Sequence, residues 1–169
     1  MYYQTVQQFI RTLKNLDAIL EKTIAHAAKR KFDVNNFVSA RLFPDMLPFV
    51  SQIRIACDHA KNLAANLSGR EAPRHEDSET TMDDLRGRIA KCLAYLETFT
   101  ASDFARTTPD QVVKLTFPAG KTILADEYLF ARQIPNFYFH TGMAYALLRK
   151  GGVEIGKGDF IGPLALRDA

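Results

Sequence analysis

The chain has 169 residues, of which 47% are hydrophobic and 24% charged, and its formal net charge is +3. This balance is typical of a globular protein, and the length predicts one domain spanning residues 1–169. The small charge and the scattered basic residues argue against a nucleic-acid partner. Two cysteines exclude a disulfide framework and favour a reducing compartment. With no secretion signal and no long apolar stretch, we expect a cytoplasmic protein without a membrane partner.

Helical periodicity begins almost at the start of the chain. Apolar residues recur at steps of three and four from about Tyr3 to Arg30, which predicts an amphipathic first helix. The cations of residues 29–31 fit the negative end of that helix. A second helix is predicted to begin at Asp45, a good N-cap, and to end near Leu67, before a glycine.

The third helix follows a polar connection of residues 69–80. Thr80 or Thr81 is its expected cap, with an acidic residue three positions later. Residues 112–124 alternate β-prone and turn-forming types, which predicts a short hairpin. A last helix is expected from about Asp126 to Lys150, with Pro135 in a helix-starting position.

These elements predict an all-α fold, an antiparallel four-helix bundle with a small β-hairpin before the last helix. Gly151-Gly152 is interpreted as the stop of that helix. The segment from Gly156 to Asp159 is interpreted as a turn, because neither glycine motif has the spacing of a phosphate-binding loop. The apolar residues between Val153 and Ala169 predict that the tail folds back on the bundle.

Among the four histidines, only His140 is predicted to point into the bundle. Its helical neighbours Met143 and Leu147 are apolar, and Asn136 lies one turn earlier. The other three histidines are expected on solvent-facing positions: His26, His59 and His75. A buried histidine needs partners for its ring nitrogens, so His140 is either a hydrogen-bonded core residue or part of a pocket.

An alternating up-and-down bundle would bring several polar residues to the level of His140. The candidate pocket consists of His140, Asn136, Asp58, Asp17 and Arg54. A carboxylate such as Asp58 or Asp17 would then hold one ring nitrogen of His140. Cys57 and Cys92 fall in the same layer, where they fit either a zinc site or, as we prefer, inert core thiols.

Four motifs carry a resemblance to a known family. They are Ala40–Met46, Ala56–Lys61, Pro135–His140 and Gly156–Gly162. In their order and spacing the chain resembles an uncharacterised bacterial family within the DinB/YfiT-like superfamily. The resemblance implies a four-helix bundle whose better-known members, including thiol transferases and hydrolase-like enzymes, hold a divalent metal. Three histidines hold the metal in those members. One lies on the second helix, and the other two lie four residues apart on the last helix.

The resemblance carries over to this chain only in part. His140 matches one position of the last helix, and Asp58 is a substitute on the second helix, so His140 and Asp58 are the candidate metal ligands. We expect a small-molecule pocket around His140 and no cofactor. One alternative is a divergent enzyme with a divalent ion such as zinc or nickel, and another is a homodimeric interaction module.

Overall fold

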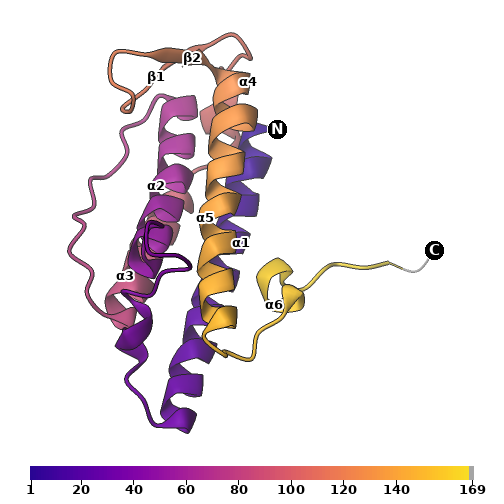
Figure 1. Ribbon diagram of the computed structural model, residues 1–169. Helices are drawn as coiled ribbons and strands as arrows, with labels where there is room; N and C mark the ends of the chain where they lie inside the picture. Colours follow the sequence, from indigo (N-terminus) through magenta and orange to yellow (C-terminus); the bar gives the residue numbers. More distant parts are fainter. Residues whose placement is uncertain (168–169) are drawn as a thin grey trace.

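The computed structural model describes residues 1–167, which form four long helices with a small hairpin at one end (Figure 1). The long helices are α1 (Tyr2–Arg30), α2 (Phe49–Ser68), α3 (Met82–Leu96) and α5 (Ile134–Lys150). Strands β1 (Val112–Lys114) and β2 (Thr122–Leu124) pair antiparallel, with Val113 opposite Ile123. The predicted four-helix fold and the hairpin before the last helix are therefore confirmed.

Shorter elements connect and extend the long helices. Two 3-10 turns, η1 (Val34–Phe37) and η2 (Ala101–Phe104), follow α1 and α3. The last helix is entered through α4 (Ala125–Glu127) and a π-helical segment, η3 (Tyr128–Gln133). A final helix, α6 (Lys157–Ile161), packs on α1. Within the described residues, none of the helices has the length and apolar character needed to cross a bilayer.

The directions of the helices differ from a simple alternation. Helices α2 and α5 are antiparallel, because Gln52 pairs with His140 whereas Asn66, further along α2, pairs with Tyr128. Helices α2 and α3 are parallel, and the connection of residues 69–80 returns along the outside of the bundle (Figure 1). Helices α1 and α5 are also parallel, since Tyr2 contacts Asp126 and Phe9 stacks on Phe137.

A buried arginine attaches the connection of residues 69–80 to the bundle through ion pairs. The side chain of Arg88 on α3 is 1% exposed and forms ion pairs with Asp58, Asp77 and Glu79. Arg54 on α2 also pairs with Glu79, and Lys61 pairs with Asp58. Three carboxylates thus balance three cations, which satisfies most of the buried charge.

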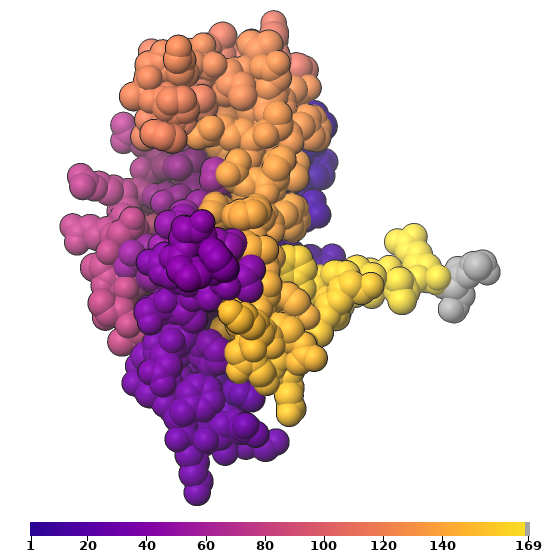
Figure 2. Space-filling view, in the orientation of Figure 1, coloured from indigo at the N-terminus to yellow at the C-terminus, as the bar shows by residue number. Residues whose placement is uncertain are grey.

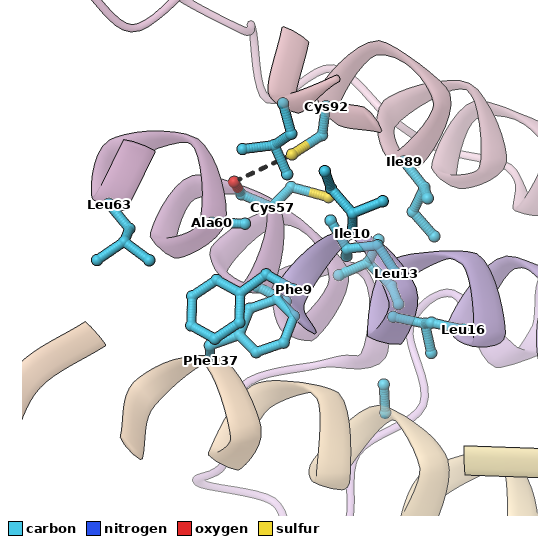
Figure 3. Close-up of a cluster of buried hydrophobic side chains, with 14 of the residues drawn as sticks. Phe9, Ile10, Leu13, Leu16, Cys57, Ala60, Leu63, Ile89, Cys92 and Phe137 are labelled. Carbon is cyan, nitrogen blue, oxygen red and sulfur yellow. Dashed lines mark hydrogen bonds between the residues drawn. The ribbon is translucent and has the colours of Figure 1, made fainter. Parts of the chain in front are cut away.

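The hydrophobic core lies between the four long helices (Figure 3). The rings of Phe9 and Phe137 stack with their centroids 3.8 Å apart. Cys57 and Cys92 are fully buried at one level of α2 and α3, and the Cys92 thiol donates to the Cys57 carbonyl oxygen at 3.4 Å. This placement confirms the expectation that the two thiols share a layer of the core.

The predicted start of α2 and the turn predicted at Gly156–Asp159, where α6 begins, were wrong, whereas the tail folds back on the bundle in part. Helix α2 begins at Phe49 with Pro48 as its N-cap, four residues after the predicted start at Asp45. The reason is Pro48, whose ring disfavours helical backbone at the preceding residue. In the tail, Val153 and Ile155 are buried as expected, but Leu164 is exposed. Residues 168–169 lie outside the described part of the chain.

The arginine network predicts that replacing either of two arginines on α3 lowers the free energy of unfolding, and that the two losses differ in size. Replacing Arg88 with leucine leaves Asp58 and Glu79 without their buried partner, so we expect a loss of about 3–5 kcal/mol in the free energy of unfolding. Arg86 pairs with Asp17 at a site where both side chains are about one-third exposed. Arg86→Leu is the matched control and should cost less than about 1 kcal/mol. Equal costs in chemical denaturation would contradict the assignment of Arg88 as the main fastening.

The burial of Cys57 and Cys92 predicts that both thiols react slowly with labelling reagents in the folded protein. The neighbouring Cys92 thiol and burial raise the pKa of Cys57 well above its ordinary value. Because both thiols are fully buried and the reagent needs access to the sulfur, both cysteines should resist an aromatic disulfide reagent in native buffer and react rapidly in denaturant. Fast labelling of the native protein at neutral pH would show that the core opens far more readily than its packing implies.

Candidate functional site

The seam between α2 and α5 carries a row of polar pairs within an otherwise apolar contact. His140 Nδ1 lies 2.8 Å from Gln52 Oε1, and His59 Nδ1 bonds to Gln133 Oε1. Further along, the Asn66 amide donates to the Tyr128 hydroxyl at 2.7 Å. Helix α2 contributes one glutamine and one histidine to the first two pairs, and the continuous stretch of η3 and α5 contributes the other glutamine and histidine.

The same seven-residue spacing occurs on both helices. Gln52 precedes His59 by two helical turns, and Gln133 precedes His140 by two turns. A seven-residue step returns a side chain to nearly the same face of a helix. Antiparallel packing of two such segments then places each histidine opposite the other helix's glutamine. The result is a local pseudo-twofold arrangement with two imidazoles at its centre.

The two imidazole rings face one another across the seam. Their centroids lie 6.1 Å apart and their planes differ by 14°. His140 is 8% exposed and Gln52 is 2% exposed, whereas His59 is half-buried. The expectation that His59 is solvated was therefore wrong. The helical angle of His59 is remote from the apolar stripe of α2, but α5 packs against that side of the helix.

The glutamines determine which nitrogen of each ring carries the proton. The Gln52 amide nitrogen donates to the Leu47 carbonyl oxygen at 3.0 Å, which directs its Oε1 toward His140. A carbonyl oxygen only accepts, so Nδ1 of His140 must donate and its Nε2 is left as an acceptor. Gln133 Oε1 makes the same demand on His59.

The two Nε2 atoms remain available. Within residues 1–167, neither Nε2 has a hydrogen-bond partner, and neither belongs to the fully buried unpaired atoms. Each atom therefore retains some solvent-accessible surface. The site presents two neutral nitrogen lone pairs in fixed orientations.

Burial keeps both rings neutral at physiological pH. Desolvation, with a smaller contribution from His59, lowers the pKa of His140 to about 4. Desolvation also lowers the pKa of His59, and the nearby Arg132 adds to that effect. Within the described residues, no carboxylate forms a hydrogen bond with either ring that would oppose these shifts.

The structure brings together only part of the predicted pocket. Asn136 lies on the same helix as His140, but its amide donates to the Arg132 carbonyl oxygen. Asp58 faces α3, where it pairs with Arg88, and Asp17 pairs with Arg86 on another face. Arg54 is occupied by Glu79. The expected carboxylate partner of His140 is thus a glutamine.

Sequence reasoning missed Gln52, Gln133 and His59. A signal for them is present, since a Gln-Ile pair with a histidine seven residues after the glutamine occurs at both 52–59 and 133–140. The π-helical segment η3 ends at Gln133, just before Pro135, and segments of this kind are frequent at functional sites. Of the other predicted solvent-facing histidines, His26 and His75 are half-buried, and the Nδ1 of His75 is buried without a partner.

Comparisons with known proteins agree with this fold. The family model described as a domain of unknown function, DUF1993, matches residues 1–161. The chain belongs to the DUF1993 family. No curated protein matches this DUF1993 chain. A crystal structure of a DinB family member protein from Shewanella denitrificans is similar to it, with 41% sequence identity and a TM-score of 0.92. The likeness covers 99% of this chain and 95% of that one, which confirms the DinB-like fold.

The three-histidine metal centre implied by the DinB-like resemblance does not fit this DUF1993 chain. His59 and His140 supply one nitrogen from α2 and one from α5, but the positions four residues from His140 are Asn136 and Ala144. Asn136 is turned back to its own helix, and Ala144 has no donor atom. Residues 1–167 contain no group of three His, Cys, Asp or Glu side chains able to hold an ion.

The lowered pKa of His140 predicts a pH dependence of stability. The unfolded chain binds a proton near the ordinary pKa of about 6.5, whereas the folded protein resists protonation of this ring until about pH 4. The stabilising contribution of the neutral ring is therefore complete above pH 6.5 and is lost as the pH falls toward 4. We expect a decrease of up to about 3 kcal/mol in the free energy of unfolding.

Denaturant titrations at several pH values, on wild type and on His140→Gln, measure this dependence. The variant should lose the part of the slope that His140 contributes, because glutamine does not titrate. NMR titration of the ring should place its protonation close to pH 4. A His140 that titrates near pH 6.5 in the folded protein would contradict the burial argument.

Proposed function

We propose that this DUF1993 protein binds a small molecule at the α2–α5 seam, through the Nε2 atoms of His59 and His140. The observation that carries the proposal is the pairing of both Nδ1 atoms with glutamine oxygens, which fixes two neutral acceptors side by side. Side chains held in this way are preorganised for a ligand.

The charge state of the pair defines the ligand that it favours. Two neutral acceptors suit a ligand with hydrogen-bond donors, such as an amide, a hydroxyl or an amine. A carboxylate or phosphate gains little from rings that resist protonation, because neither Nε2 then carries a hydrogen. The ligand class is therefore a neutral or cationic donor.

Apolar surface next to the pair supports a ligand with an apolar part. Phe139 is 54% exposed, and its ring stands at 89° to that of His140 with the centroids 5.2 Å apart. Leu47 is 48% exposed, and its carbonyl oxygen accepts from the glutamine that holds His140. The segment that contains Leu47 projects from the face where α2 and α5 meet (Figure 2). A donor group at the histidines and an apolar group at Phe139 would both be accommodated.

Binding is better supported than general-base catalysis by His140. A base works best when its pKa lies near the working pH. With a pKa of about 4, His140 accepts a proton only weakly at neutral pH. The ring is thus better suited to orienting a ligand than to removing its proton.

One observation favours a second candidate, a divalent metal held by two imidazoles. Metal-binding histidines usually donate their other ring N–H to a neighbouring acceptor, as Gln52 and Gln133 provide here. Two imidazoles sharing an ion at about 2.1 Å from each nitrogen have centroids at most roughly 6.5 Å apart. The observed 6.1 Å lies within that limit, but the rings are nearly parallel, so one of them must turn before both in-plane lone pairs point at a single ion. The remaining ligands would come from solvent or a small molecule.

NMR of protein labelled with nitrogen-15 in histidine tests both candidates. The Nε2 signals of His59 and His140 should move together on titration with members of a panel of small amides, alcohols and amines that carry an aromatic ring. His140→Gln and His59→Gln should each weaken that binding at least tenfold, since one acceptor is lost. His75→Gln, in the connection of residues 69–80, is the matched control and should leave it unchanged.

Zinc and nickel titrations separate the two candidates. Saturable zinc binding that depends on both histidines, with no response to the organic panel, would favour the metal site over direct ligand binding. If neither the panel nor the metals move the two Nε2 signals, both candidates fail and the pair is a structural element of the core.

A further inference from the structure

A groove at the end of the bundle brings together two sequence features that each mark a helix end. The basic residues at the end of α1 form one wall, and the glycine turn after α5 forms the other. The groove has a volume of about 620 Å³. Its lining residues are Lys22, Ala25, His26, Lys29, Arg30, Phe32, Gly151, Gly152, Val153 and Glu154. None of these residues belongs to the His59–His140 pair.

The groove has an excess of positive charge. Three lining residues are cations, Lys22, Lys29 and Arg30, and Glu154 is the one carboxylate among the lining residues. Lys22 pairs with Asp159, but within residues 1–167 neither Lys29 nor Arg30 takes part in an ion pair. Two adjacent, exposed cations are thus left to meet a ligand.

An aromatic surface lies beside these cations. Phe32 is 36% exposed, and its ring contacts His26 and Phe37 edge to face, with centroids 5.9 and 5.8 Å apart. The contacts hold the Phe32 ring in place while leaving part of it open to the groove. A fixed, partly exposed ring is a surface on which a planar group can stack.

The opposite wall of the groove is formed by the glycine turn, which has no side chains at Gly151 and Gly152. A Cβ atom on Gly151 would lie 2.2 Å from the Phe37 ring, so the backbone packs directly on that ring. Gly152 has a φ of +88°, which side-chain-bearing residues rarely adopt. A Cβ atom on Gly152 would have no neighbour within 4 Å, so this residue adds no side chain to the open space of the groove.

We propose that this groove binds a small phosphorylated molecule with a planar ring, of the class of nucleoside monophosphates. Lys29 and Arg30 hold the phosphate, and the guanidinium of Arg30 offers it two parallel donors. The planar ring lies against Phe32 and His26. The volume falls in the usual range for small-molecule sites. The groove recognises an anion, whereas the His59–His140 pair presents neutral acceptors, so the two sites are independent.

Titration of the wild-type protein with adenosine monophosphate at low salt tests the proposal. Amide NMR signals of Gly151, Gly152 and Phe32 and the ring signals of His26 should move in a saturable way. Adenosine alone and inorganic phosphate alone should each bind at least tenfold more weakly, because each has only half of the recognised chemistry. Raising the salt concentration should weaken binding of the monophosphate.

Paired variants show whether the groove or general charge is responsible. The double variant Lys29→Gln with Arg30→Gln should weaken adenosine monophosphate at least tenfold. The control removes the same charge from the hairpin end, through Lys114→Gln with Lys121→Gln, and should bind as wild type does. Phe32→Leu should reduce the preference for the monophosphate over inorganic phosphate while leaving phosphate binding unchanged.

Three outcomes would overturn the proposal. They are no saturable binding of adenosine monophosphate up to millimolar concentration, signal changes that cluster away from the groove, or equal losses in the two double variants. The first two use only the wild-type protein, so they hold even if a variant fails to fold.

Discussion

Antiparallel packing of α2 against α5 sets the position of the polar groups in the candidate site. The two helices bury their apolar faces on each other. Within such a contact, a polar side chain is accommodated when a polar partner from the other helix lies directly opposite it. Gln52 with His140 and His59 with Gln133 satisfy that condition. A shift of α5 by one helical turn would separate both pairs and leave buried polar groups unsatisfied, at about 1–3 kcal/mol each. The pairs therefore fix the register as well as the site.

The buried charges around Arg88 make the parallel arrangement of α2 and α3 workable. Parallel neighbours need a connection that travels the length of the bundle, and residues 69–80 provide it. A polar segment of this length would gain little from packing alone. The ion pairs of Arg88 with Asp77 and Glu79 attach it to α3, while Arg54 attaches Glu79 to α2. The layer with Cys57 and Cys92 is part of the hydrophobic core itself.

The two proposed sites favour different ligands because their polar side chains are buried to different extents. At the α2–α5 seam, desolvation removes the charge from both histidines, and what remains is hydrogen-bond acceptance. At the end of α1, the cations Lys29 and Arg30 are exposed, which suits an anion. One bundle can thus offer a neutral recognition surface on its seam and a cationic one at its end.

The sequence by itself determined the helices, their inward faces and the hairpin. The stripe periodicity, the Thr81 cap and the turn chemistry are local properties, and each appears in the structure at or near the predicted residues. The common level of Cys57 and Cys92 was also predictable, because both lie near the middle of their helices, where the level does not depend on helix direction. Only the tertiary structure decided which sides of the helices meet. Asp58 turned to Arg88 and His59 to His140 because α3 and α5 pack on different sides of α2, and helical angles within one segment carry no information about that choice.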